Sequence, residues 1–251
     1  MNKQALYDYI LGVTDNSLIL GQRLGELCGH GPSLETDIAI TNIALDLLGQ
    51  CRSYYQYAAK LKGGDTTEDS IAMLRTEREY VNVLLVEQPN EHFGYVIARQ
   101  FLFDVFHLLQ MQELQKSKDE TLASIAAKNI KETLYHTRFS SDWIKRLGDG
   151  TEVSHAKIQE AINDLWPYTK ELFEVTESDQ EMIDAGIGVD VSKLKDAYYK
   201  QVAEVLEEAT LKVPEGKYFH KGGKQGIHTE HMGPLLAELQ YMQRTYPNMN
   251  W

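Results

Sequence analysis

The stretch Lys131-Glu132-Thr133-Leu134-Tyr135-His136 lies inside a long segment, residues 120–147, with the periodicity of an amphipathic helix. One face of that segment carries Leu122, Ile125, Ala126, Asn129, Thr133, His136 and Trp143. In helical bundles that bind two iron ions, a Glu and a His three residues apart on one helix both point inward as ligands. Thr133 occupies the position of that Glu, and its hydroxyl cannot bridge two cations as a carboxylate does. The stretch therefore predicts a bundle helix that has lost its metal site.

The rest of the chain contains no complete di-iron signature. Such a bundle needs two Glu-x-x-His pairs and one further Glu from each of two other helices. The only Glu-x-x-His in the sequence is Glu152-Val153-Ser154-His155, which follows the turn residues Gly148-Asp149-Gly150-Thr151. We interpret Ser154 as the N-cap of the next helix and the match as coincidental.

Composition bounds the class of protein. The 251 residues are 43% hydrophobic and 25% charged, which is typical of a soluble globular protein. The formal net charge of −12 disfavours nucleic-acid binding as the main role. Because the N-terminus lacks the apolar core of a signal peptide and no run of eighteen apolar residues could span a membrane, we expect a cytoplasmic protein. Cys28 and Cys51 are expected to be small hydrophobes in apolar helices.

Turn residues divide the chain into about eight helices, and no segment has the pattern of a strand. Four long segments with apolar stripes predict a core: 4–28, 34–61, 92–116 and 120–147. Additional helices are expected at about 67–86, at 154–173 with a kink at Pro167, at 192–210, and from Pro234 as first helical residue to about Arg244. The sequence thus predicts an all-α bundle in one domain, 1–251, with a four-helix core within about 4–147 and extra helices within 154–245.

Several motifs spread along the chain form a highly specific combination: Gln22-Arg23-Leu24-Gly25-Glu26, Leu45-Asp46-Leu47-Leu48-Gly49-Gln50, Leu84-Leu85-Val86-Glu87-Gln88-Pro89-Asn90, Ile130-Lys131-Glu132 and Gly222-Gly223-Lys224-Gln225-Gly226-Ile227-His228-Thr229-Glu230-His231-Met232-Gly233-Pro234. On these motifs the chain resembles, over nearly its whole length, the structural C subunits of the bacterial phenylacetyl-CoA epoxidases, also called phenylacetate-CoA oxygenases. The resemblance implies a ferritin-like bundle and membership of a multicomponent di-iron enzyme.

The resemblance also implies that the iron is bound by a related A subunit. Where that subunit has an Asp-Glu-Ala-Gly-His stretch, Leu47 and Gln50 replace the ligand Glu and His, and Thr133 replaces the Glu of the second pair. The Glu expected from the first helix falls near Ser17 or Leu18. Since His136 and Asp104 alone keep metal-binding side chains, we expect no metal and no cofactor in this chain, and the di-iron centre in the A subunit.

Asp104, His107 and His136 then need another role. Asp104 shares a helical stripe with Ile97, Phe101 and Leu108, so it is expected to be buried and to need either a partner or a proton. One hypothesis pairs Asp104 with His136, or with a nearby Lys or Arg, and His107 is a further candidate partner. The alternative is that backbone groups or water satisfy each side chain separately.

Residues 220–226 form the one basic, glycine-rich loop of this acidic chain. Lys221, Lys224 and free backbone N–H groups could hold a phosphate of coenzyme A or contact a partner, whereas a solvated turn is the alternative. His228 and His231 are three residues apart rather than four as in the zincin motif. We interpret them as hydrogen-bonding histidines at a helix entry, with a coenzyme A or partner contact as the other option.

The resemblance therefore implies a non-catalytic subunit that pairs with and stabilises the di-iron A subunit in aerobic phenylacetate catabolism. The complex would epoxidise the ring of phenylacetyl-CoA with O₂ and with electrons from a reductase subunit. Two alternatives stay open: a free-standing ferritin-like di-iron oxidase or iron-storage protein, and a structural homodimer of this chain without a catalytic partner.

Overall fold

The computed structural model describes residues 2–216, 218–247 and 249, and within these ranges the regular structure is helical, without strands. The predicted all-α class is confirmed, and long helices that pack against their neighbours in the chain are typical of ferritin-like proteins. The chain forms two compact units: a first unit of residues 1–87 and 222–251, and a second unit of residues 88–221. Each unit contains two of the four long helices predicted for the core, so the single domain with one core remains a prediction.

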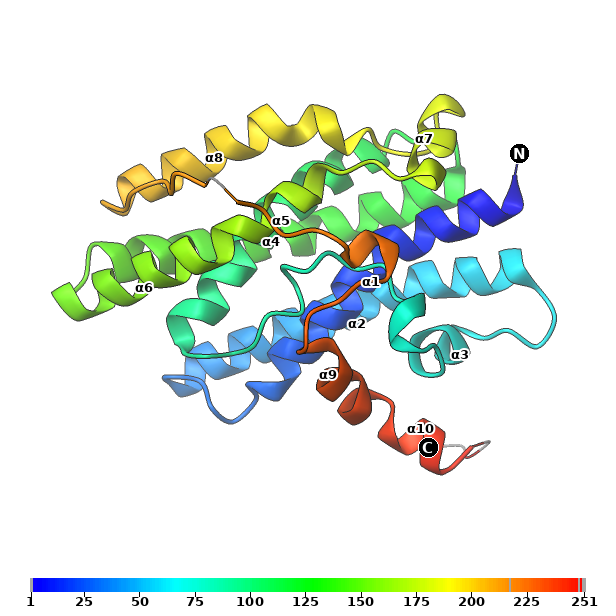
Figure 1. Cartoon of the computed structure of the whole chain (residues 1–251), viewed down its shortest axis with the longest axis horizontal. Coiled ribbons are helices and arrows are strands. Elements are labelled where there is room, and N and C mark those ends of the chain that lie inside the picture. The colour runs from blue at the N-terminus through cyan, green and yellow to red at the C-terminus, as the bar shows by residue number, and fades with distance from the viewer. Residues whose placement is uncertain (1, 217, 248, 250–251) are drawn as a thin grey trace. The chain divides into compact units, whose positions relative to one another are not determined.

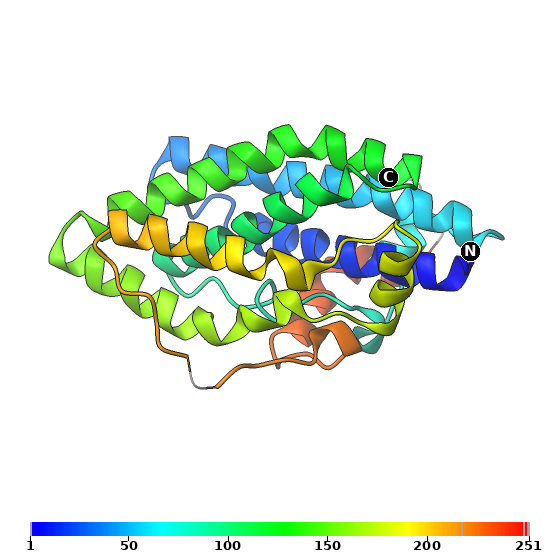
Figure 2. The same cartoon turned by 90° about the horizontal axis from the view of Figure 1, so that it is seen from above.

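The first unit is built on α1 (Lys3–Glu26) and α2 (Leu34–Lys62), which run antiparallel side by side (Figures 1 and 2). Ser33 caps α2 by accepting a hydrogen bond from the Thr36 N–H, and Gly63 ends it with φ of 72°, a conformation that glycine adopts without strain. The shorter elements of this unit are α3 (Glu68–Met73), η1 (Glu77–Glu79), η5 (Gly223–Gln225), α9 (Met232–Leu239) and α10 (Tyr241–Thr245).

The second unit surrounds α4 (Phe93–Leu114), which contacts α5 (Glu120–Gly148), α6 (Glu152–Leu165) and α8 (Lys195–Glu208) (Figure 2). Most side chains of α4 are buried, as expected for a helix that is apolar on nearly all sides. The remaining elements are η2 (Trp166–Tyr168), η3 (Lys170–Phe173), α7 (Glu177–Asp184) and η4 (Val191–Leu194). None of the described helices has the length and apolarity needed to cross a membrane.

The segment 67–86 is less helical than predicted. After α3 and η1, residues 80–92 form no helix, although Tyr80, Val83, Leu85 and Val86 are fully buried. Side chains of α1 hold this segment, because Asp15 accepts a hydrogen bond from the Val81 N–H and Asn16 accepts one from the Val83 N–H. Tertiary hydrogen bonds therefore replace the helical ones that apolar periodicity had predicted.

Several helix boundaries after residue 148 also differ from the prediction, and one helix was missed. Thr151, not Ser154, caps α6, and Ser154 is the third helical residue of a capping box. Pro167 ends α6 instead of kinking it, since the chain continues as the 3₁₀ turns η2 and η3. α7 was not predicted at all, and Pro234 is the third rather than the first residue of α9, which stops at Leu239 before α10 begins.

Candidate functional site

A row of buried polar side chains lines the contact between α4 and α5 in the second unit, and we call it the polar seam. The spacing of three or four residues puts these side chains on one face of each helix. No member exposes more than 2% of its surface. The members are Gln100, Asp104 and His107 on α4 and Asn129, Thr133, His136 and Ser140 on α5.

Asp104 forms its hydrogen bonds with two neutral side chains. Oδ1 accepts from Gln100 Nε2 at 2.6 Å, and Oδ2 lies 2.8 Å from Ser140 Oγ, which also lies 3.0 Å from the His136 carbonyl oxygen. The hypothesis that Asp104 forms an ion pair with His136 or a nearby Lys or Arg is therefore wrong for this structure. The physical reason is that two neutral hydrogen bonds satisfy a protonated carboxyl group, which needs no cation.

Burial sets the charge of the seam. It raises the pKa of Asp104 to about 8, although the hydrogen bonds from Ser140 and Gln100 favour the ionised form. Burial, together with the neighbouring His136, lowers the pKa of His107 to about 3. At neutral pH, Asp104 is thus mostly protonated and His107 is neutral, so neither offers the seam a charge.

The residues at the predicted ligand positions cannot complete a di-iron set. The Thr133 hydroxyl donates to the Asn129 carbonyl oxygen at 3.0 Å, a bond within its own helix. In the first unit, Leu47 is fully buried and Gln50 is 2% exposed on α2. Across the described part of the chain, no three His, Cys, Asp or Glu side chains gather in a group that could hold a metal ion. The donor set does not fit two iron ions, which need several carboxylates to offset their charge.

The first unit contains a buried carboxylate that the sequence analysis missed. Asp15 on α1 is fully buried and accepts from Arg75 Nη1 at 2.9 Å, Arg75 Nη2 at 2.6 Å, Tyr55 Oη at 2.6 Å and the Val81 N–H at 3.0 Å. The Arg75 guanidinium also lies 4.1 Å from the centre of the Tyr80 ring. Burial alone would lower the pKa of Arg75, but the charge of Asp15 raises it, so the guanidinium stays charged. The signal in the sequence was a carboxylate within an apolar helix, two residues before Ser17.

The glycine-rich loop is more tightly built than predicted. The N–H groups of Gln225, Gly226 and Ile227 already donate to carbonyl oxygens within the loop. A side chain at Gly223 would collide with the Asn82 backbone, so the loop lies directly on that segment. These N–H groups are therefore not free to cradle a phosphate.

The four residues predicted to contact coenzyme A or a partner, Lys221, Lys224, His228 and His231, differ in exposure and in hydrogen bonding. Lys221 is exposed and lies 3.9 Å from Glu174, and Lys224 is half-buried. His228 forms hydrogen bonds as predicted, with Glu87 and the Tyr80 carbonyl oxygen. His231 is the residue before α9, and its carbonyl oxygen accepts from Arg23 at 3.3 Å.

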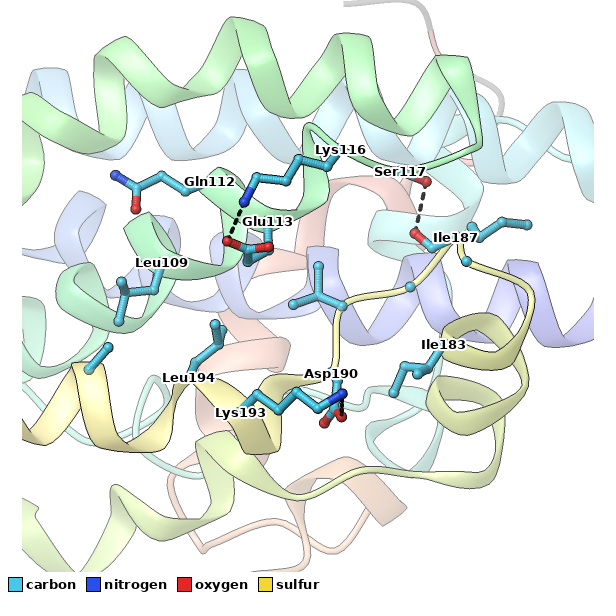
Figure 3. Close-up of a pocket in the computed structure, with 14 residues that line it drawn as sticks. Leu109, Gln112, Glu113, Lys116, Ser117, Ile183, Ile187, Asp190, Lys193 and Leu194 are labelled. Carbon is cyan, nitrogen blue, oxygen red and sulfur yellow. Dashed lines mark hydrogen bonds and ion pairs between the residues drawn. The ribbon is translucent and has the colours of Figure 1, made fainter.

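A half-open cavity of about 590 Å³ in the second unit lies between the end of α4 and the α7–α8 connection (Figure 3). Its lining mixes apolar side chains, among them Leu109, Ile183 and Leu194, with polar and charged ones. Each of its four charged side chains pairs with another lining residue, Lys116 with Glu113 at 2.6 Å and Lys193 with Asp190 at 3.0 Å. The charges of the lining are thus neutralised in pairs and do not favour an anionic or a cationic ligand.

The fold, whose regular structure is helical in the described residues, and the buried polar seam between α4 and α5 are those of a ferritin-like protein. The whole chain, residues 1–251, matches the family described as "Phenylacetic acid catabolic protein", and it belongs to that family. It is 50% identical over 251 residues, covering 100% of both chains, to the protein of Escherichia coli (strain K12) that is named as the C subunit of the 1,2-phenylacetyl-CoA epoxidase.

Proposed function

We propose that this chain is the non-catalytic subunit of a 1,2-phenylacetyl-CoA epoxidase in phenylacetate catabolism, and that it pairs with and stabilises a di-iron A subunit. The observation that carries the proposal is the chemistry at the ligand positions, where Leu47, Gln50 and Thr133 stand. An isobutyl, an amide and a hydroxyl group supply no negative charge to two iron ions. The full-length similarity to a protein named as the C subunit of this epoxidase supports the same role.

The polar seam supports a structural role for the residues that remain. Asp104 is fully buried, and it forms hydrogen bonds with Gln100 and Ser140. Its hydrogen bond with Ser140 joins α4 to α5. Asp104, His107 and His136 would therefore hold the two helices together and take no part in oxygen activation.

A row of exposed aliphatic side chains on α2 supports an interface with a partner. Leu34, Ile38 and Leu45 are exposed by 72%, 51% and 60%, and their spacing puts them along one side of the helix. Contiguous apolar surface on a folded protein marks sites of protein association. We assign this row to the contact with the A subunit.

The test is to purify the chain alone and together with the A subunit, and to measure iron content and phenylacetyl-CoA turnover for each. An iron-free, inactive single chain and an iron-containing pair that turns over with a reductase would support the proposal. Stoichiometric iron in the single chain would favour a free-standing di-iron oxidase or storage protein. A homodimer that does not bind the A subunit would favour the purely structural alternative.

A pair of matched variants tests the interface. Leu45→Glu puts a charge into the proposed contact and should weaken copurification with the A subunit at least tenfold, since an unpaired buried charge is costly. Val153→Glu, on α6 and 66% exposed, is the control and should bind normally. Equal binding by both variants would exclude this row from the interface.

Contact with coenzyme A remains a further proposal for Lys221 and Lys224, and for His228 and His231 as its neighbours. Because the N–H groups of Gln225, Gly226 and Ile227 already donate within the loop, the lysine side chains would be the main contacts of a phosphate. Replacing both lysines by Ala should raise the KM of the assembled complex for phenylacetyl-CoA and leave kcat unchanged. An unchanged KM would leave the loop as a structural turn.

A further inference from the structure

The C-terminal segment of the first unit, residues 222–245, is fastened to residues 75–87, and we call this segment the C-terminal arm. Near the end of the arm, Gln240 Nε2 donates to the Arg75 carbonyl oxygen at 2.9 Å and to Tyr80 Oη at 2.8 Å. Near its start, the arm is held by the carboxylate of Glu87, which is fully buried. The arm is therefore tied at two points, both within residues 75–87.

Glu87 gathers donors from both sides of this contact. Its Oε1 accepts from the backbone N–H and from the hydroxyl of Thr229, each at 2.7 Å. Its Oε2 accepts from Asn82 Nδ2 at 3.0 Å and lies 2.8 Å from His228 Nδ1. Because three other donors already bond to the carboxylate, Glu87 acts as an acceptor toward His228 as well.

The two ring nitrogens of His228 both face acceptors. Nδ1 faces the Glu87 carboxylate, and Nε2 lies 3.0 Å from the Tyr80 carbonyl oxygen, which can only accept. A neutral imidazole carries one N–H and would leave one of these contacts without a proton, whereas an imidazolium donates to both. The side chains of His228 and Glu87 have no exposed surface, so water cannot replace the missing bond. We propose that a protonated His228 latches the C-terminal arm and that loss of this proton loosens the arm.

Charged groups of both signs surround the latch, and the acidic ones favour the protonated ring. Glu77 and Glu87 are the acidic groups, and both precede the arm in the chain. Arg23 of α1 donates to the Glu87 carbonyl oxygen and pairs with Glu26 at 2.9 Å. Arg78 donates to the Gly226 carbonyl oxygen at 3.5 Å. Burial by itself lowers the pKa of His228, but the hydrogen bond and charge of Glu87, the Tyr80 carbonyl and the charge of Glu77 raise it above its ordinary value.

The direction of the pH effect follows from this raised pKa. A histidine with a raised pKa in the folded chain contributes its full stabilisation below the unfolded value of about 6.5 and loses it as pH rises through the folded value. The arm should thus be held below about pH 6.5 and should loosen as the pH rises through the raised pKa of His228.

Hydrogen exchange of the full-length chain tests the latch. Backbone exchange in residues 222–245, corrected for intrinsic rates, should become at least about tenfold faster between about pH 6 and pH 9, since a charge-assisted hydrogen bond is lost. Residues of α4 serve as the internal reference and should not change. Exchange in the arm that does not depend on pH would overturn the proposal.

Variants and direct observation of the ring separate protonation from simple packing. His228→Gln should expose the arm at all pH values, whereas His231→Gln, three residues away with no ring hydrogen bond among the described residues, should behave like the wild type. If the Gln variant fails to fold, nitrogen NMR of the wild-type imidazole decides the point. Protons on both His228 nitrogens at neutral pH support the latch, and a single protonated nitrogen excludes it.

Discussion

Asp15 in the first unit and Asp104 in the second are both fully buried carboxyl groups in the middle of long helices. Asp15 has a guanidinium, a phenol and a backbone N–H around it, whereas Asp104 has an amide and a hydroxyl. The two buried groups therefore differ in charge. Asp15 is paired with the Arg75 cation, whereas Asp104 keeps its proton at neutral pH. The comparison teaches that the partners supplied by the fold, and not burial alone, decide the charge of a buried carboxyl group.

The largest effect is expected when the cation of the first pair is removed. Arg75→Met keeps most of the side-chain volume but leaves Asp15 buried without its cation, which should cost about 3–5 kcal/mol of unfolding free energy. Urea unfolding at neutral pH measures this. Arg52→Met is the control, because Arg52 is 70% exposed in its 3.5 Å pair with Glu68 and should change stability by no more than about 0.5 kcal/mol. A loss below about 1 kcal/mol for Arg75→Met would refute the charged pair.

Asp104→Asn should change the pH dependence of stability. The pKa of Asp104 is raised from 3.8 to about 8, so the native state binds more protons than the unfolded state between these values, and stability falls as pH rises. The wild type should lose about 2 kcal/mol between about pH 6 and pH 8 through this group, and the Asn variant should lose none of it. Urea unfolding at several pH values gives the comparison. Parallel curves for the two proteins would mean that Asp104 is ionised in the folded chain.

Removing one neutral hydroxyl donor beside Asp15 and one beside Asp104 sharpens the comparison, with smaller losses of unfolding free energy. Tyr55→Phe removes a hydrogen bond to a carboxylate and should cost about 1.5–3 kcal/mol, whereas Ser140→Ala removes one to a mostly protonated carboxyl and should cost about 0.5–1.5 kcal/mol. Both residues are buried, so cavity effects are similar in kind. Unfolding free energies at neutral pH should rank the two variants in this order, and the reverse order would contradict the assigned charge states.

The smallest effect concerns reactivity rather than stability. Burial and the neighbouring charge of Asp15 raise the pKa of the Cys51 thiol to about 12, whereas Cys28 is exposed. A thiol reagent should modify one cysteine in the folded chain and two in urea. Cys28→Ser should abolish the native reaction. Rapid modification of Cys51 in the folded chain would contradict the closed environment around Asp15. Cys28 lies beyond the end of α1 and is exposed, which corrects the expectation that it is a small hydrophobe in an apolar helix.

Much of the helical framework could be predicted from local pattern. The four long helices begin and end within two residues of their predicted bounds, because apolar periodicity and capping residues act over a few neighbours. The non-helical stretch 80–92 could not be predicted, because its backbone is satisfied by side chains of α1, more than sixty residues earlier in the chain. α7 was missed for a different reason: it is only eight residues long, with one buried side chain, too short for a periodic signal.

The candidate site also has a part that could be predicted from the sequence and a part that could not. Thr133 could be assigned from the sequence because a ligand Glu is expected three residues before His136, whereas Leu47 and Gln50 were assigned through the resemblance to the A subunit. The partners of Asp104 could not be predicted, since Ser140 approaches it from another helix, 36 residues away.

By itself, the sequence determined the helical class and the places of the long helices, because periodicity is a local property of the chain. Only the tertiary structure decided which buried groups carry charge. Arg75 reaches Asp15 across 60 residues, and His228 reaches Glu87 across 141. The energy of a buried charge depends on the donors, acceptors and counter-charges that folding brings within a few ångströms of it.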